Sequence, residues 1–128
     1  MQHIAALFFI IMLTLNIQAG IGAGSSAEGP LPVEEVVGAV PTEYLLEHNY
    51  PNPFNPSTVI AYSIPKASHV SIKVFDLLGN LITTLVNQYQ EAGKFKVKFN
   101  ADELSNGVYF YKIQSGSFTD IKKMLLLK

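Results

Sequence analysis

Alternation of apolar and polar residues is the dominant pattern from about residue 57 to the end of the sequence. In "HVSIKVFD", residues 69–76, the residues Val70, Ile72 and Val74 would share one face of a strand. In "KFKVKFN", residues 94–100, lysines alternate with aromatic and aliphatic residues. A period of two is typical of strands with one buried face. The pattern therefore predicts β-strands and, beyond Thr42, no helix.

Short turn-forming stretches separate the apolar runs, and Gly79, Gly93 and Gly107 lie in three of them as structural turn residues. If "EYLLEHN" at residues 43–49 is included, about seven short strands follow one another at spacings near ten residues. Such a rhythm indicates antiparallel hairpins. We therefore expect an all-β antiparallel sandwich over residues 43–128. Gly107, which opens a strand, is expected to hold a backbone angle that other residues avoid.

The inward positions of these strands define the expected core. It comprises Ile60, Tyr62, Val70, Ile72, Val74, Leu81, Leu85, Phe95, Val97, Phe99, Tyr109, Tyr111 and Ile113. The lysine rows between them are expected to be solvated faces or guarded edges. A basic stripe that binds a ligand is the less favoured interpretation.

The N-terminal part of the sequence has a different character. An apolar run from Ile4 to Leu15 precedes several small residues. It is too short to cross a bilayer core of about 30 Å, but it is typical of a secretory signal peptide. We expect a signal peptide at residues 1–22, cleaved somewhere between Ala19 and Gly24 so that the mature protein begins between Gly20 and Ser25, with an uncleaved anchor as the alternative. Residues 23–42, rich in small residues, are expected to form a disordered linker.

Composition narrows the possible partners. The sequence has no cysteine, so neither a disulfide nor a lipidated cysteine is available, and the fold must rest on its hydrophobic core. Residues 1–65 contain five acids and no Lys or Arg, whereas residues 66–128 contain nine lysines and five acids. No arginine is present. Because arginine is the preferred residue for reading phosphates and bases, no nucleic-acid partner is expected.

Residues able to carry out catalysis are scarce. Outside the expected signal peptide the only histidines are His48 and His69, and they show no metal-ligand spacing. Asp102 and Glu103 could form one side of a calcium site, but a turn is the simpler interpretation. No nucleophile elbow, phosphate-binding loop or zinc-protease motif occurs. The sequence therefore predicts no enzyme, no metal or cofactor, and no small-molecule substrate.

The segment "NYPNPFNP" stands directly before the first long alternating stretch. This junction motif comprises Asn49, Tyr50, Pro51, Asn52, Pro53, Phe54, Asn55 and Pro56. Proline fixes φ and biases the preceding residue toward extended conformations. The asparagines can form Asx-turns, and Tyr50 and Phe54 are expected to pin the segment against the sandwich. A stiff linker is the plainer alternative.

Residues 46–128 resemble, almost end to end, the type A C-terminal sorting domain of the type IX secretion system, found on secreted proteins of Bacteroidetes and related bacteria. The markers are "NYPNPFNP", "VSIKVFDLLG" at residues 70–79, "LSNGVYFY" at residues 104–111, and the final "KKMLLLK". The domain is also similar to the immunoglobulin-like module of flagellar hook-capping proteins. The resemblance implies an immunoglobulin-like β-sandwich.

The resemblance also implies a route of export. The general secretion machinery would carry the chain through the signal peptide into the periplasm. An outer-membrane translocon would then recognise the folded domain, and a sortase-like protease could remove it while attaching cargo to the cell surface. The expected recognition residues are those of the last strand: Lys122, Lys123, Met124, Leu125, Leu126, Leu127 and Lys128.

The expected localisation is extracellular or at the outer-membrane cell surface. Sorting domains of this family normally follow a large enzyme or adhesin, whereas only the short linker precedes this one. A structural or adhesive immunoglobulin-like module at the cell surface is therefore the alternative function. The sequence alone leaves open whether this chain is a sorting tag without a passenger, a gene remnant or a stand-alone surface module.

Overall fold

Eight β-strands and no helix make up residues 31–128, the part of the chain that the computed structural model describes. The strands are β1 (Val33–Val36), β2 (Leu45–Leu46), β3 (Ser57–Ile64), β4 (Ser68–Asp76), β5 (Leu81–Gln90), β6 (Gly93–Asn100), β7 (Gly107–Ser115) and β8 (Phe118–Leu126). The predicted signal peptide, its cleavage site and the first part of the predicted linker lie outside these residues.

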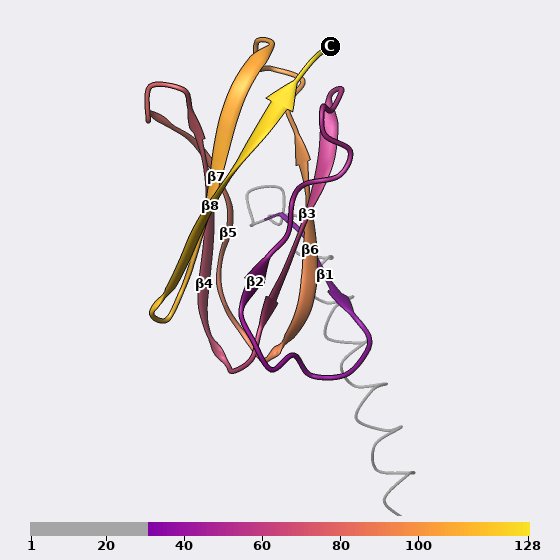
Figure 1. Ribbon diagram of the computed structural model, residues 1–128, viewed down its shortest axis with the longest axis vertical. Helices are drawn as coiled ribbons and strands as arrows, with labels where there is room; N and C mark the ends of the chain where they lie inside the picture. Colours follow the sequence, from indigo (N-terminus) through magenta and orange to yellow (C-terminus); the bar gives the residue numbers. More distant parts are fainter. Residues whose placement is uncertain (1–30) are drawn as a thin grey trace, which may run out of the picture.

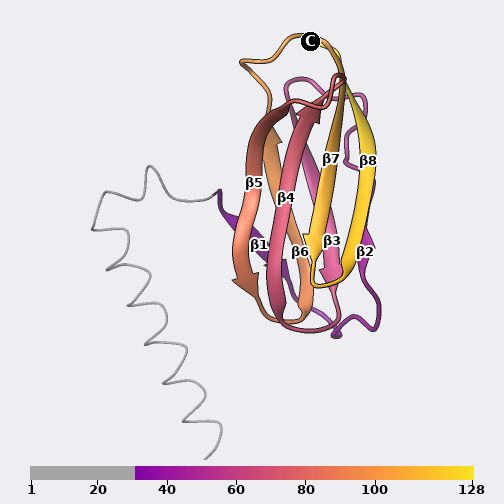
Figure 2. The ribbon, with the colours of Figure 1, turned by 90° about the vertical axis from the view of Figure 1, so that its left-hand side faces the viewer.

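Two four-stranded antiparallel sheets pack face to face (Figure 1). The first sheet has the order β1-β6-β3-β2 and the second the order β5-β4-β7-β8. Figure 2 views the outer face of the second sheet, with β5 and β8 at its two edges. The predicted all-β antiparallel sandwich is confirmed, and β2 to β8 are the strands that the sequence pattern predicted.

β1 is a strand that the sequence pattern did not predict, so the count of about seven was one too low. It lies within residues 23–42, where we expected a disordered linker, and it pairs with β6 from Val33↔Val97 to Val36↔Lys94. Four residues with two glutamates in the middle carry no clear alternation. The pairing is a tertiary effect: Val33 packs against the core, and Glu34 forms an ion pair with Lys96 at 3.4 Å.

The core lies between the two sheets and contains every predicted residue except Leu81. Leu81 was predicted wrongly and is 54% exposed. The pairing of β4 with β5 shifts register twice, between Ile72 and Lys73 and between Val74 and Phe75. Such irregularities change which face a strand buries, so the alternation cannot be extended through them. The core also includes Leu46, Phe54, Ile64, Val86, Ala101, Met124 and Leu126.

Candidate functional site

The junction motif lies along the end of β8, so two segments far apart in the sequence form one structure. The backbone N–H of Phe54 donates to the carbonyl of Leu125 at 2.9 Å, and the N–H of Leu127 donates to the carbonyl of Phe54 at 3.0 Å. The side-chain oxygen of Asn52 accepts the N–H of Leu125 at 3.1 Å. The motif thus adds a short parallel pairing to the free edge of β8.

Asn49 holds the first part of the junction motif together. Its side chain is almost fully buried, and its Nδ2 donates to the Pro51 carbonyl at 3.2 Å and to Thr58 Oγ1 at 3.0 Å. The Thr58 hydroxyl donates to the same Pro51 carbonyl at 2.8 Å. These bonds tie the turn to the start of β3. The peptide bonds before Pro51, Pro53 and Pro56 are cis.

Only one of the two aromatic residues in the motif pins it to the sandwich. Phe54 is buried and packs against Phe99, with ring centroids 6.0 Å apart. Tyr50 is 81% exposed, so the expectation that it would help to anchor the motif was wrong. Its backbone pairs with Val59 instead, and this pairing leaves the ring in solvent.

The predicted recognition residues of β8 fall on two faces and do not form a single surface. Met124 and Leu126 are fully buried in the core. Leu125 and Leu127 lie on the other side, as the alternation predicts, and Leu127 is half exposed. The burial of Met124 and Leu126 shows that these two residues stabilise the fold. Only the outward-facing residues are available to a partner.

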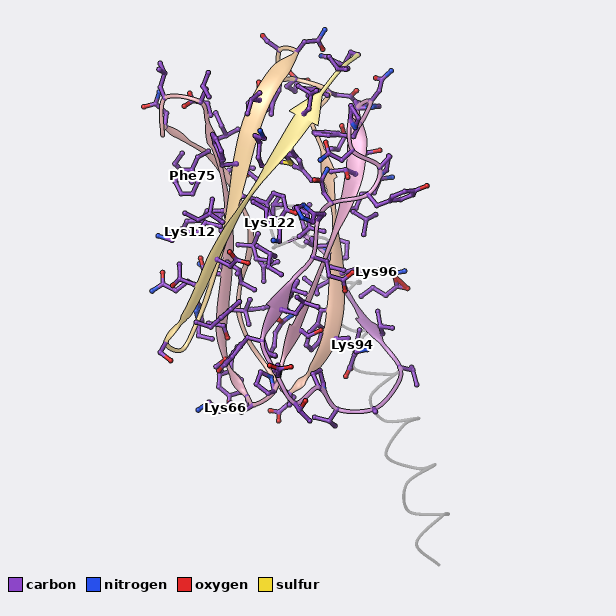
Figure 3. The ribbon with its side chains drawn as sticks, in the orientation of Figure 1. Lys66, Phe75, Lys94, Lys96, Lys112 and Lys122 are labelled. Atoms are coloured by element: carbon purple, nitrogen blue, oxygen red, sulfur yellow. The ribbon has the colours of Figure 1, made fainter. Side chains whose placement is uncertain are left out.

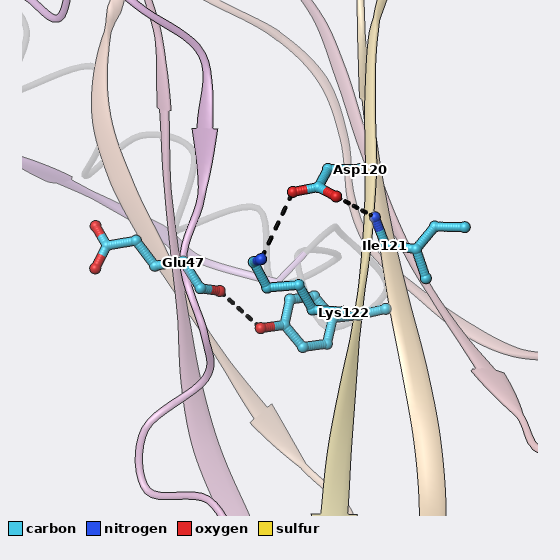
Figure 4. Close-up of polar contacts among 5 residues, drawn as sticks. Glu47, Asp120, Ile121 and Lys122 are labelled. Atoms are coloured by element: carbon cyan, nitrogen blue, oxygen red, sulfur yellow. Dashed lines mark hydrogen bonds and ion pairs between the residues drawn. The ribbon is translucent and has the colours of Figure 1, made fainter.

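The lysines of this stretch also have different surroundings. Lys122 forms an ion pair with Asp120 at 3.7 Å, on the side of β8 that faces β2 (Figure 4). Lys123 is exposed. Lys128 donates through its backbone to Asn106 Oδ1 at 2.8 Å and through Nζ to the Asp102 carbonyl at 3.0 Å. Lys123 is therefore the lysine of this set that combines exposure with an outward-facing strand position.

β8 has an open edge over part of its length. Both backbone groups of Leu125 point away from β7, toward the junction motif. Because this orientation repeats every second residue in an antiparallel pair, Thr119, Ile121 and Lys123 present their backbone groups to the same edge. The N–H of Ile121 is bonded to Asp120 Oδ1 at 2.9 Å (Figure 4). Among residues 31–128 no strand pairs with this part of the edge.

Tyr111 links the second sheet to the segment after β2. Its hydroxyl donates to the Glu47 carbonyl at 2.7 Å. Burial raises the pKa of Tyr111 to about 12. Nearby, the rings of Tyr44 and Phe118 stack with centroids 4.9 Å apart. The first contact ties β7 to the segment after β2, and the second ties the start of β8 to the segment before β2.

The residues considered for catalysis or metal binding do not come together. His48 and His69 are exposed. The N–H of Asp102 donates to Asn100 Oδ1 at 2.9 Å, as in an Asx-turn. Among residues 31–128 no group of three His, Cys, Asp or Glu side chains could hold a metal ion. No helix in this part of the chain could cross a membrane.

Residues 48–127 match the family described as the secretion system C-terminal sorting domain. The chain belongs to this family. The match extends from the residue before the junction motif to the residue after β8, so it includes both segments that pair in the structure. It confirms the resemblance to type IX sorting domains, whose role is to direct secretion. Membership implies interaction with the type IX machinery and export to the cell surface or outer membrane.

One solved structure with some likeness is PorZ, described as an essential bacterial surface component of the type-IX secretion system of Porphyromonas gingivalis. The TM-score is 0.46 and the sequence identity 21%, and the match covers 63% of this chain and 11% of PorZ. This chain therefore spans about a tenth of the length of PorZ. No curated protein sequence matches the chain significantly.

Proposed function

We propose that this domain acts as a ligand of the type IX outer-membrane translocon, which recognises the open edge of β8, and that it carries out no catalysis itself. The observation that carries the proposal is the edge itself. Within the family-matched region and among residues 31–128, no strand pairs with the outer edge of β8 at Thr119, Ile121 and Lys123, and the only bond there is from the Ile121 N–H to its neighbour Asp120. The junction motif covers the edge beyond these residues.

An extended segment of a partner could pair with this edge by β-augmentation. Main-chain hydrogen bonds would give affinity, and neighbouring side chains would set the register. Lys123 is placed for the second role, because it is exposed where the open edge meets the covered one. The junction motif limits the length of edge that a partner can use, which favours one register.

The wider route follows from the same proposal. The general secretion machinery delivers the chain to the periplasm through its signal peptide, and the translocon then carries the folded domain outward. A sortase-like protease at the surface cleaves in the exposed segment after β1, residues 37–43, where Val37 is 98% exposed. Exposed, irregular segments are the preferred sites of proteolysis.

A proline in the open edge tests the proposal. Lys123→Pro removes a backbone N–H that points to the edge and leaves the β7–β8 hydrogen bonds in place. Lys123→Ala is the matched control, because it removes the same charge and keeps the N–H. Both are made in the full chain and expressed in a host that carries type IX machinery. Surface, medium and periplasmic fractions are compared, and circular dichroism checks folding.

We expect the proline variant to remain folded and accumulate in the periplasm. The alanine variant should still reach the surface, because it keeps the main-chain hydrogen bonds that give affinity and loses only a side chain that helps to set the register. Equal surface export of the two folded variants would contradict recognition through the edge. Surface binding without dependence on the translocon would instead support an adhesive module.

A further inference from the structure

The outer face of the second sheet carries an apolar surface that the proposed function does not use. Cross-strand neighbours on this face form two rows. The first contains Leu81 of β5, Phe75 of β4, Phe110 of β7 and Lys123 of β8, and the second contains Val108 of β7 and Leu125 of β8. Phe75 points away from the first sheet in Figure 3, and no described segment covers this face in Figure 2. The four residues Phe75, Val108, Phe110 and Leu125 are half-buried by one another and their neighbours.

The same face carries positive charge without compensation. Lys73 on β4 lies directly opposite Lys112 on β7. The only acids in the four strands are Asp76 and Asp120. Asp76 bonds to the β4–β5 turn, and Asp120 pairs with Lys122 toward β2. Within residues 31–128 neither Lys73 nor Lys112 has an ion-pair partner. Like charges directly opposite in a sheet are destabilising, so this arrangement is unfavourable in the isolated domain.

The β4–β5 turn extends the apolar surface in a fixed conformation. Asp76 Oδ1 accepts the N–H groups of Leu78 at 2.9 Å and Asn80 at 2.8 Å. These hydrogen bonds lower the pKa of the Asp76 carboxyl, and the bond from the Asn80 backbone has the largest effect. Leu77 and Leu78 are 67% and 86% exposed as a result. Two leucines held in solvent by a well-bonded turn are unusual on a surface that contacts nothing.

We propose that the outer face of the second sheet docks a second protein surface, one with an apolar centre and carboxylates opposite Lys73, Lys112 and Lys123. The apolar residues would fill the centre of the contact, and the carboxylates would relieve the repulsion between Lys73 and Lys112. In identifying this partner with the secretion machinery the inference rests on the proposed function, but the surface lies on the face of the sheet and shares only Lys123 with the open edge of β8.

A protein fits this surface better than an anionic membrane. A domain that inserts into an anionic membrane would bury Leu77 and Leu78 of the β4–β5 turn in the bilayer and would carry lysines close to that turn. Here Phe75, Phe110 and Val108 lie on the flat face of the sheet, and Lys123 continues the row of Phe75 and Phe110. A lysine placed next to apolar contacts needs an acceptor at one fixed position, which a folded protein surface provides.

The test places a photo-crosslinking residue on each outer face of the full chain in a host with type IX machinery. Phe110→p-benzoylphenylalanine probes the proposed surface, and Val59→p-benzoylphenylalanine, on the outer face of the first sheet, is the control. Each crosslinking residue is also introduced into three variant backgrounds. The first carries Lys73→Glu with Lys112→Glu, the second carries Lys73→Arg with Lys112→Arg, and the third carries Lys94→Glu alone. Lys94 lies on the opposite sheet (Figure 3), so its reversal places negative charge away from the proposed surface, with half the change in net charge of the double glutamate variant.

We expect position 110 to form a protein adduct whose crosslinked peptide is acidic. The double glutamate change should reduce it at least about tenfold, whereas the arginine pair and Lys94→Glu should retain it. The thermal midpoint of the double glutamate variant should stay unchanged, which excludes misfolding. An adduct with phospholipid or lipopolysaccharide alone, an adduct indifferent to the charge reversal, or no adduct at position 110 would overturn the inference.

Recognition of the open edge of β8 and docking on the outer face of the second sheet can be disproved independently. If Lys123→Pro is exported normally while the charge-dependent adduct persists, the edge proposal is wrong and this surface is supported. If the wild-type chain does not reach the surface, the adduct experiment still decides whether the face binds an acidic protein.

Discussion

The backbone of Phe54 exchanges hydrogen bonds with Leu125 and Leu127, so the segment that introduces the sandwich also closes the end of its last strand. The side chain of Phe54 is buried beneath this pairing. The junction motif is therefore part of the folded domain and not a linker. Its placement means that the end of β8 is fully structured only when the junction is in place.

Phe54→Ala should lower the free energy of unfolding by about 3–5 kcal/mol, because it removes a buried ring that packs on Phe99. It should also speed hydrogen exchange at the Leu127 amide, which is bonded to the Phe54 carbonyl. Tyr50→Ala, at an exposed ring in the same motif, is the control and should leave both quantities nearly unchanged. Equal losses in the two variants would show that Phe54 is not the anchor.

Deleting residues 123–128 should unfold the domain, because the deletion removes the fully buried Met124 and Leu126. Each is worth about 2–5 kcal/mol when truncated, so their joint loss is similar in size to the margin of about 5–15 kcal/mol of a typical domain. The deletion also removes the pairing of residues 123–126 with β7. Deleting only residues 127–128 should preserve cooperative unfolding, since Leu127 is half exposed. Circular dichroism during urea titration distinguishes the two, and a folded six-residue deletion would contradict the assigned core. A defect in export caused by the longer deletion therefore says nothing about recognition.

Gly107→Val should destabilise the domain by about 1–3 kcal/mol, because Gly107 has φ of +152°. A Cβ at this position would meet no atom within 4 Å, so the cost comes from the backbone and not from crowding. Gly107→Ala should therefore cost a similar amount, since both side chains meet the same restriction. A denaturation midpoint that falls for valine alone would indicate crowding instead.

The free energy of unfolding should fall as the pH rises from 10.0 toward about 12. Part of this fall comes from Tyr111, because burial raises the pKa of its hydroxyl from 10.0 to about 12 in the folded domain. Below pH 10.0 the hydroxyl is protonated in both states, so its contribution is complete. Above this pH the unfolded chain loses the proton first, which favours unfolding. Burial raises the pKa of Tyr62 as well, with the same sign. Urea midpoints of the wild type and Tyr111→Phe should converge across this range. A constant difference between them would show that Tyr111 does not titrate as described.

The sequence predicted the sandwich well because its strands bury one face each and carry a clean alternation. β6 is the clearest case, since Phe95, Val97 and Phe99 are buried and the lysines between them are exposed. Gly107 was also predicted correctly from its place after a turn. Where the alternation is interrupted, as between Leu81 and Leu85, the prediction failed at the register shifts of β4 and β5.

The arrangement of the candidate site could be predicted only in part. Local patterns identified the junction motif and the last strand, but not their pairing, because contacts between distant segments leave no local period. The same limit hid β1 and the opposed pair of Lys73 and Lys112, which becomes visible only when the strand partners are known. The available signal was the presence of lysines at alternate strand positions. This pattern is equally typical of a solvent-exposed sheet face that binds no partner.

The most direct test of the account is where the full chain goes when the translocon is present and when it is absent. Wild-type chain is expressed in a host that carries type IX machinery and in the same host lacking its outer-membrane translocon. Surface and medium fractions are then compared with the periplasm. The account predicts delivery to the surface in the first host and accumulation in the periplasm in the second. The same distribution of folded chain in both hosts would contradict it.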